Sequence, residues 1–204
     1  MDKKRAILQF NNIKKKAKNI RLAADGWNKD WKTLISTIMS ARTTDKKTIP
    51  VAGELFKKYK SVKALANAKI SEVAKVIKPV NFYKTKSKNV VGCAKMLVSD
   101  YNGKVPRDFE DLVKLPGVGR KTANVFLAVQ GYGEIGVDTH VAYISKKMGW
   151  TNSDKQKNIE EDLKKIFPKR MWGKINWVLV RFGQTYTSRR EKNKILDEIR
   201  GNYE

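Results

Sequence analysis

Hydrophobic residues recur along this chain at the three- and four-residue spacing that places side chains on one face of an α-helix. No segment alternates apolar and polar residues for long enough to predict a β-strand. We therefore predict an all-α protein of about ten helices joined by short connectors. Two apolar stripes are clear: Leu34, Ile35, Ile38 and Met39, and Val90, Ala94, Leu97 and Val98. We also expect an apolar helix over 172–182 and a polar helix over 191–202.

Polar residues and prolines predict where several helices begin and end. Asp108 and Asp111 form a capping arrangement at the start of a short helix. Ser153 or Asp154 is expected to cap a later helix, and Pro168 to end it. No internal repeat, low-complexity stretch or linker rich in proline or serine divides the chain, so any domain boundary must come from tertiary structure.

Positive charge dominates the composition. The 204 residues include 44 Lys and Arg against 20 Asp and Glu, which gives a formal net charge of +24, while 41% of the residues are hydrophobic. The hydrophobic fraction is enough for a packed core, and the charge indicates a polyanionic partner. Nucleic acid is the first candidate and an anionic membrane surface the second. No apolar run approaches the roughly 20 residues of a membrane span, so we expect no insertion into a membrane.

The basic residues gather in three groups, which together favour a nucleic-acid groove over ordinary solvated helix faces. These groups are Lys14, Lys15, Lys16, Lys18 and Arg21; Lys84, Lys86 and Lys88; and Arg189, Arg190, Lys192 and Lys194. The N-terminal residues are polar and unlike a secretion segment. We therefore expect an intracellular monomer located with the chromosomal DNA, in the cytoplasm or nucleoid.

Cysteine and histidine are too few for several kinds of site. Cys93 is the only cysteine and His140 the only histidine. This count excludes an intrachain disulfide, a thiolate-ligated iron–sulfur cluster and a transition-metal site built from Cys and His. Cys93 lies in an apolar helical stretch, where we expect an inert packed thiol.

The segment from 115 to 141 carries the most chemical information. Gly117 and Gly119 allow a tight turn and the close approach of a ligand to the backbone. Arg120 and Lys121 then open a helix, and the unpaired amides of a helix N-terminus bind anionic oxygens. Asp138 follows a glycine-rich turn. The segment thus joins a phosphate-binding hairpin to an amine and a carboxylate.

This hairpin resembles the helix-hairpin-helix motif of DNA repair proteins. The longer pattern is similar to the endonuclease III branch of the helix-hairpin-helix DNA glycosylase superfamily, and the likeness covers nearly the whole chain. The matching landmarks are 115–125, 137–141, 40–45, 81–86 and 102–106. The resemblance implies two helical lobes with a DNA-binding groove between them. We expect a helical barrel domain over 25–136, with the hairpin at about 108–130, and a second domain formed by 1–24 and 137–204.

The implied function is excision of a damaged or mismatched pyrimidine from duplex DNA, after the base has flipped out of the stack. Lys121 would attack the sugar carbon C1′, form a Schiff base and break the strand by β-elimination. Asp138 would stabilise the cationic charge that develops on the sugar, or deprotonate a nucleophile. The carboxylate of Asp138 can also cap the next helix, which does not exclude this role.

Other residues receive roles from the same resemblance. Phe82 stands where the family carries an apolar wedge, and Tyr83 and Ser40 are assigned to the base pocket. Packing of Phe82 and Tyr83 in the core is the alternative. His140 is interpreted as structural or close to the DNA backbone rather than catalytic. The residues assigned to DNA binding are Gly117, Val118, Gly119, Arg120, Thr122, His140, Arg42, Phe82, Lys84, Arg189 and Arg190.

Two departures from the family pattern leave the excised base open. Arg42 replaces the usual glutamine that fills the gap left by the flipped base, and it would contact either the opposite base or a phosphate. The stretch 182–190 has none of the four cysteines that usually hold an iron–sulfur cluster. We therefore expect no metal and no cofactor, apart from a monovalent cation that the hairpin is able to hold.

Two alternative functions remain. In a monofunctional mismatch or uracil-type glycosylase, Asp138 would activate water and Lys121 would only support binding. A non-catalytic protein that binds DNA structures would use the hairpin alone. In every case the expected partner is double-stranded DNA, with a damaged, mismatched or abasic site for the two enzymes.

Overall fold

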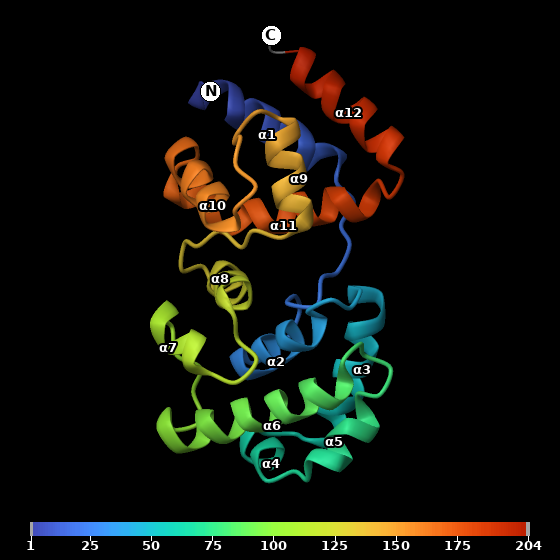
Figure 1. The fold of residues 1–204 in the computed structure, drawn as a ribbon, viewed down its shortest axis with the longest axis vertical. Helices are drawn as coiled ribbons and strands as arrows, with labels where there is room; N and C mark the ends of the chain where they lie inside the picture. Colours follow the sequence, from blue (N-terminus) through green and yellow to red (C-terminus); the bar gives the residue numbers. More distant parts are fainter. Residues whose placement is uncertain (1, 203–204) are drawn as a thin grey trace. The chain divides into compact units, whose positions relative to one another are not determined.

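The computed structural model describes residues 2–202, and over this range the chain forms helices and connecting loops without a β-strand (Figure 1). The all-α prediction is confirmed, and the described chain contains twelve helices rather than about ten. They are α1 Lys3–Lys16, α2 Asp30–Ser40, α3 Asp45–Lys58, α4 Val62–Ala66, α5 Ile70–Val76, α6 Tyr83–Asp100, α7 Phe109–Lys114, α8 Arg120–Val129, α9 Thr139–Lys147, α10 Gln156–Ile166, α11 Lys169–Thr185 and α12 Arg189–Gly201.

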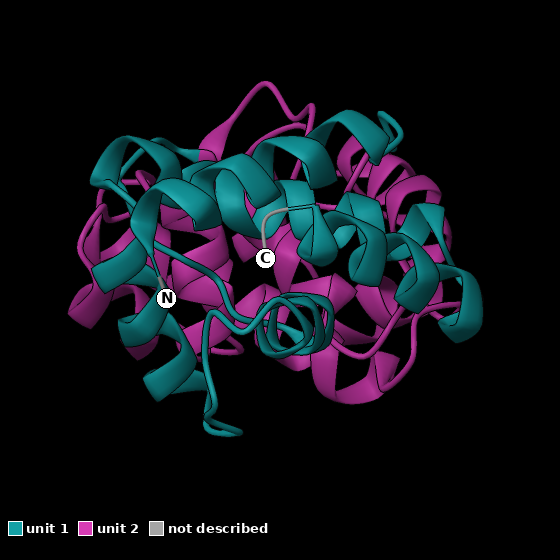
Figure 2. Cartoon of the chain, turned by 90° about the horizontal axis from the view of Figure 1, so that it is seen from above, with its two compact units in different colours: residues 1–20, 130–204 teal, residues 21–129 magenta. Residues whose placement is uncertain are grey.

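The chain divides into two compact units, which are coloured separately in Figure 2. Unit 1 comprises Met1–Ile20 and Gln130–Glu204, and unit 2 comprises Arg21–Val129. The sequence interpretation places its domain boundaries at 24/25 and 136/137. In the structure Lys121 belongs to unit 2 and Asp138 to unit 1. A groove between the two lobes stays a prediction.

Unit 2 is built around the long helix α6, which packs against α4, α5 and α2. Both predicted apolar stripes contribute to its core: Leu34 and Ile38 of α2 and Val90 and Leu97 of α6 are at most 2% exposed. Each fully buried aliphatic side chain contributes roughly 1.5–3 kcal/mol relative to an exposed one. The same core reaches the hairpin through Val118, which is 5% exposed.

Unit 1 packs α11 against α1 and α9. The ring of Phe167 lies 5.8 Å from that of Phe10 and 5.0 Å from that of Trp150, measured between centroids. Helix α12 packs on α1 and α9 through its buried residues Leu196 and Ile199. The C-terminal helix is thus held by apolar packing.

Two of the predicted helix starts have different outcomes. Asp108 caps α7 as expected, because its Oδ1 accepts the backbone N–H groups of Glu110 and Asp111 at 2.9 and 3.2 Å. Helix α10 instead begins after Lys155, which provides no side-chain cap. The prediction of a Ser153 or Asp154 cap was wrong: Ser153 Oγ accepts the N–H of Lys155 in the preceding turn, and Asp154 pairs with Lys146. Among the described helices, none has the length and apolar character that crossing a membrane requires.

Candidate nucleic-acid interface

The hairpin between α7 and α8 requires glycine at position 117. Gly117 has φ +81°, in the left-handed region that side chains disfavour. A Cβ atom at Gly117 would lie 2.8 Å from Cβ of Asn89 and 3.1 Å from Cγ2 of Ile38. The turn closes with a hydrogen bond from Val118 N–H to the Leu115 carbonyl at 3.0 Å. The hairpin is therefore fitted closely onto α6 and α2.

The second glycine has a different environment. Gly119 is not in the left-handed region, and a Cβ atom there would meet no other atom within 4 Å. No neighbouring atom therefore covers Gly119 on the side where a Cβ atom would stand. Its carbonyl accepts the N–H of Ala123 at 3.0 Å, which begins the hydrogen-bonding of α8.

The first turn of α8 presents two cations at the surface. Arg120 is exposed, with its guanidinium carbon 5.2 Å from the centroid of the Phe109 ring. Lys121 is exposed, while Thr122 is buried at 9% exposure. An amine must be neutral to act as a nucleophile, and burial favours the neutral form. Since Lys121 is exposed, bound DNA would have to supply that burial.

Arg42 and Phe82 form an exposed pair in unit 2. Both have left-handed backbones, with φ +54° and +59°, a conformation that costs roughly 1–2 kcal/mol for residues with a side chain. The guanidinium carbon of Arg42 lies 4.8 Å from the centroid of the Phe82 ring, and Phe82 is 54% exposed. Core packing of Phe82 is therefore wrong. The Arg42 carbonyl accepts a 2.8 Å hydrogen bond from Nδ2 of Asn81.

Lys86 lies beneath this pair and is buried, at 6% exposure. Its Nζ donates to the Met39 carbonyl at 2.6 Å, the Ala41 carbonyl at 2.5 Å and the Thr43 hydroxyl at 3.0 Å. Burial lowers the pKa of Lys86 to about 8. Each bond from a charged donor contributes roughly 1.5–3 kcal/mol, so three are comparable with the several kcal/mol that burying an ammonium costs.

The burial of Lys86 corrects the interpretation of the second basic group. That group was predicted to face a nucleic-acid groove, and Lys84 and Lys88 are indeed exposed. Lys86 instead points into the unit, where its three donors match three oxygen acceptors. It is a structural cation at the C-terminal end of α2, where the helix dipole favours positive charge.

A small cavity adjoins the exposed pair. It has a volume of about 250 Å³ and is bounded by the exposed pair, by α6 and by Gly117 of the hairpin. Ser40 lies near the end of α2, half-buried, and its hydroxyl donates to the Thr37 carbonyl at 2.9 Å. Tyr83 is half-buried against the core of unit 2. Their assignment to a base pocket stays a prediction. The lining residues of the cavity include Ile38, Arg42, Phe82, Lys86, Asn89 and Gly117.

In unit 1, Asp138 caps α9. Its Oδ1 accepts the N–H of Val141 at 2.9 Å, and the residue is half-buried. His140, in the first turn of the same helix, packs against Gly183 of α11: a Cβ atom at Gly183 would lie 2.1 Å from Nδ1 of His140. The close approach of α9 and α11 at this glycine gives His140 a packing role. Any contact of His140 with DNA stays a prediction.

The loop that leads into Asp138 is held by hydrogen bonds to helices α10 and α11 of unit 1. The buried Asn176 of α11 donates from Nδ2 to the Gly136 carbonyl at 2.7 Å. Lys164 of α10 bonds Glu134 at 2.6 Å and Glu160 at 2.8 Å. These contacts restrain the backbone immediately before the carboxylate that the sequence singles out.

The third basic group lies at the start of α12. Arg189 and Arg190 are exposed in its first turn, after the Ser188 cap. The guanidinium carbon of Arg189 lies 5.6 Å from the centroid of the Tyr143 ring, and Tyr143 donates to Asn193. The predicted contact of Arg189 and Arg190 with DNA stays a prediction.

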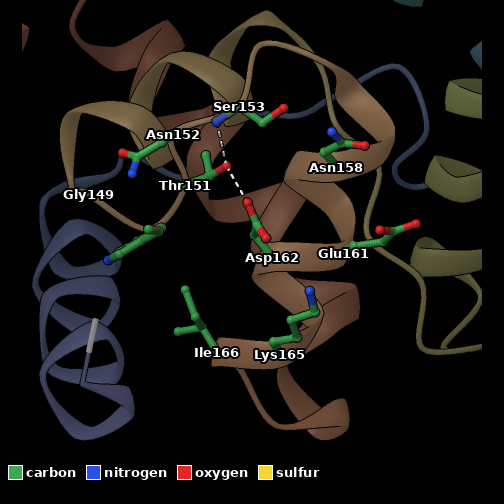
Figure 3. Close-up of a pocket in the computed structure, with 10 residues that line it drawn as sticks. Gly149, Thr151, Asn152, Ser153, Asn158, Glu161, Asp162, Lys165 and Ile166 are labelled. Carbon is green, nitrogen blue, oxygen red and sulfur yellow. Dashed lines mark hydrogen bonds between the residues drawn. The ribbon is translucent and has the colours of Figure 1, made fainter.

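Two other features fall outside this interface. Cys93 is fully buried, and burial raises the pKa of its thiol to about 12, as expected for a packed thiol. A polar pocket of about 740 Å³ follows α9, and in it Thr151 Oγ1 donates to Asp162 at 2.7 Å. Figure 3 shows the side chains that line this pocket. The carboxylates of Glu161 and Asp162 outnumber its one lysine, Lys165, so the pocket is poorly suited to a polyanion.

Sequence reasoning missed the functions of Lys86, Asn176 and Gly183 in holding the predicted site residues. One signal was present for Lys86. The α6 stripe of Val90, Ala94 and Leu97 extends back by four residues to position 86, which marks the buried face. Within residues 2–202, no group of three or more His, Cys, Asp or Glu side chains is arranged to hold a metal.

The sequence of this chain is similar to those of known DNA repair proteins. Residues 35–169 match the HhH-GPD superfamily of base excision DNA repair proteins. Endonuclease III of Thermotoga maritima is 42% identical over 156 residues, covering 76% of this chain and 73% of that protein. Endonuclease III of Bacillus subtilis is 39% identical over 155 residues, covering 74% and 70%.

Solved structures of endonuclease III also resemble this chain. The structure of a trapped endonuclease III–DNA covalent intermediate, an estranged-adenine complex, matches with a TM-score of 0.85 at 32% identity, over 93% of this chain and 90% of that one. A non-covalent endonuclease III–DNA complex matches with a TM-score of 0.84 at 31% identity, over 93% and 89%. This chain therefore belongs to the HhH-GPD superfamily, in its endonuclease III-like branch, and is a DNA glycosylase of base excision repair.

Proposed function

We propose that this glycosylase also has AP lyase activity and that Lys121 is its nucleophile. The observation that carries the proposal is the position of Lys121, exposed on the first turn of α8 directly after the close-fitting Gly117 turn. Phosphates bound by the hairpin would bring the sugar of the target nucleotide near the Lys121 amine. The trapped covalent endonuclease III–DNA intermediate supports this choice, since a covalent bond to DNA requires a protein nucleophile.

The proposed reaction has two stages. The neutral Lys121 amine attacks C1′, the bond from C1′ to the base breaks, and the base leaves with the bonding electrons and takes up a proton. The sugar ring opens to a Schiff base on Lys121. Removal of a proton from C2′ then expels the 3′ phosphate by β-elimination, and water hydrolyses the Schiff base to release the cut strand.

Asp138 is the proposed carboxylate partner. Positive charge develops on the sugar as the base departs, and an adjacent carboxylate lowers the energy of that state. Its hydrogen bond to Val141 N–H and the fastened loop before it restrict where the carboxylate lies within unit 1. Because Lys121 and Asp138 belong to different units, the proposal requires that the DNA-bound protein bring both to one sugar.

The proposed substrate is a damaged or mismatched pyrimidine flipped out of duplex DNA, with oxidised pyrimidines first. Extrusion leaves a gap in the stack, and an apolar side chain inserted there offsets part of the lost stacking. The exposed Phe82 ring and the Arg42 guanidinium over it supply such a pair. We further propose that the enzyme acts as a monomer without a metal or iron–sulfur cofactor, and that the hairpin is able to hold a monovalent cation.

One observation favours a second candidate, a monofunctional glycosylase in which Asp138 activates water. Lys121 is exposed, whereas an amine nucleophile must be neutral and burial is what favours the neutral form of an amine. In that case Lys121 would only contact DNA. The two mechanisms differ in whether a covalent adduct forms.

Borohydride trapping on a duplex with an abasic site tests the proposal. The protein is expected to form a reducible adduct that Lys121→Gln abolishes and the control Lys95→Gln retains, because Lys95 is an exposed lysine of α6 outside the hairpin. Asp138→Asn should slow release of thymine glycol from a duplex by about 10²–10⁴-fold. Base release without an adduct would support the monofunctional mechanism, and an unchanged rate in Asp138→Asn would contradict the proposed role of that carboxylate.

A further inference from the structure

Lys86 links the two halves of the exposed pair, although it lies beneath the surface. Its backbone N–H donates to the Phe82 carbonyl at 2.9 Å. Its side chain reaches the other half, where Nζ donates to the Ala41 carbonyl at 2.5 Å and the Thr43 hydroxyl at 3.0 Å. One residue therefore contacts the segments that carry both Phe82 and Arg42.

The contacts of Lys86 bracket Arg42 along the chain. Its acceptors lie on the residues immediately before and after Arg42, while the carbonyl of Arg42 itself is taken by Asn81. Arg42 is held in a left-handed conformation that an arginine rarely adopts. Such a conformation persists when the surrounding contacts determine it. The bonds around Arg42 supply that determination.

The three N–H donors of the Lys86 ammonium match the number of acceptors around it. An ammonium has three N–H donors, and Lys86 uses them on three oxygens, those of Met39, Ala41 and Thr43. None of these partners is a carboxylate, so a positive charge is buried against neutral oxygens at the end of a helix. An apolar residue would fill the same space without that cost. The placement is therefore best explained by the shape it imposes on residues 40–43.

We infer that Lys86 is a positioning residue for base extrusion, holding the end of α2 so that Arg42 and Phe82 meet DNA as one fixed pair. This inference rests on the proposed insertion of that pair into the gap left by the flipped base. Lys86 contacts no DNA itself. Its loss should therefore slow the reaction where a base pair must be opened, and much less where the target base already lacks a partner.

The test compares Lys86→Met with Lys95→Met, an exposed lysine of the same helix. Two duplexes carry thymine glycol, opposite adenine in one and opposite an abasic site in the other. Single-turnover release by Lys86→Met should fall about tenfold or more on the first duplex, since misplacement of a positioning group by an ångström costs up to about a hundredfold. Release from the second duplex should stay within about twofold. Lys95→Met should match the unmodified protein on both.

Amide hydrogen exchange without DNA provides a measurement that does not depend on activity. The N–H of Thr43 donates to the Ser40 carbonyl at 2.9 Å, and its exchange should accelerate in Lys86→Met while the core of α6 stays protected. Unchanged exchange at 41–43, or an equal loss of rate on the two duplexes, would overturn the inference. If the unmodified protein released no base from either duplex, the proposed substrate would fail, and the exchange result would still decide whether Lys86 holds this turn.

Discussion

The hairpin and the Arg42–Phe82 pair reach the same backbone conformation by different means. Gly117 has φ +81° and no side chain, and its neighbours leave no room for one. Arg42 and Phe82 have φ +54° and +59° with large exposed side chains. In the hairpin the residue type removes the strain. In the pair the strain remains, and hydrogen bonds from Asn81 and Lys86 hold the turn.

The difference is consistent with the role proposed for each turn. A phosphate-binding turn presents backbone amides, and glycine allows a close approach. A wedge must present a side chain, so glycine is excluded even where the backbone would favour it. Residues held in sparsely populated conformations gather at functional sites for this reason. The exposed pair keeps large side chains on left-handed backbones, whereas Gly117 has no room for a side chain.

The largest expected effect is that of Gly117→Ala. The added Cβ would stand 2.8 Å from Cβ of Asn89, and the left-handed backbone would cost a further penalty. Together these should lower the free energy of unfolding by about 3 kcal/mol and abolish base release. Chemical denaturation measures the first effect and a duplex excision assay the second.

Gly119→Ala is the matched control for stability, because its Cβ would meet open space and its φ is not left-handed. Its free energy of unfolding should change by no more than about 0.5 kcal/mol. Equal destabilisation by the two substitutions would show that the steric difference between the glycines has no energetic consequence.

A smaller effect is expected at the exposed pair, where activity should fall without a loss of stability. Phe82→Gly removes the left-handed strain of a phenylalanine and should leave the free energy of unfolding unchanged or raise it by about 1 kcal/mol. Base release from a duplex should nevertheless fall about tenfold, because stacking of an aromatic side chain on a base contributes about 1–3 kcal/mol. The two assays used for Gly117→Ala measure both changes.

Asn102→Gly provides the control for this prediction. Asn102 is the third left-handed non-glycine residue of the described chain, with φ +51°, and it lies beyond the far end of α6. Its substitution should leave base release unchanged. A destabilised Phe82→Gly protein, or one with full activity, would refute the interpretation of strain kept for function.

The sequence predicts the helices of this fold better than their ends. The stripes at Leu34 and Val90 are buried as the periodicity indicates, because the helical period is imposed by one extended core. Helix starts depend on competition among nearby polar groups. Asp108 caps α7, whereas Ser153 bonds a turn and Asp154 pairs with Lys146 across the unit surface. The partner of Ser153 is two residues away and that of Asp154 eight residues away, so cap preference alone does not decide which polar residue begins a helix.

For the site, the sequence indicates which residues carry chemistry but not what supports them. Gly117 and Asp138 are predicted from motif and spacing, and Phe82 from the resemblance to the endonuclease III branch. The function of Lys86 does not, because a lysine between two exposed lysines is read as surface charge. Its burial depends on where α2 ends relative to α6, which is a tertiary property. The spacing of α6 contained the only local hint.

The smallest expected effect is a pH dependence of stability that separates Lys86 from the glycine turn. Burial lowers the pKa of Lys86 from 10.5 to about 8, so between these values the unfolded chain holds a proton that the folded protein has released. Raising the pH through this window therefore favours the folded state, and lowering it through about 8 removes the gain. The facing groups are two carbonyls and a hydroxyl, which do not titrate there.

The difference in unfolding free energy between the unmodified protein and Lys86→Met should accordingly shift in favour of the unmodified protein by about 1 kcal/mol from pH 7 to pH 9. Comparing the two proteins cancels the titration of the other lysines and tyrosines. Lys95→Met is the matched substitution at an exposed lysine of the same helix. A flat curve for Lys86→Met would mean that the buried ammonium keeps its proton. The hydrogen bonds to the end of α2 would then outweigh its burial even at alkaline pH.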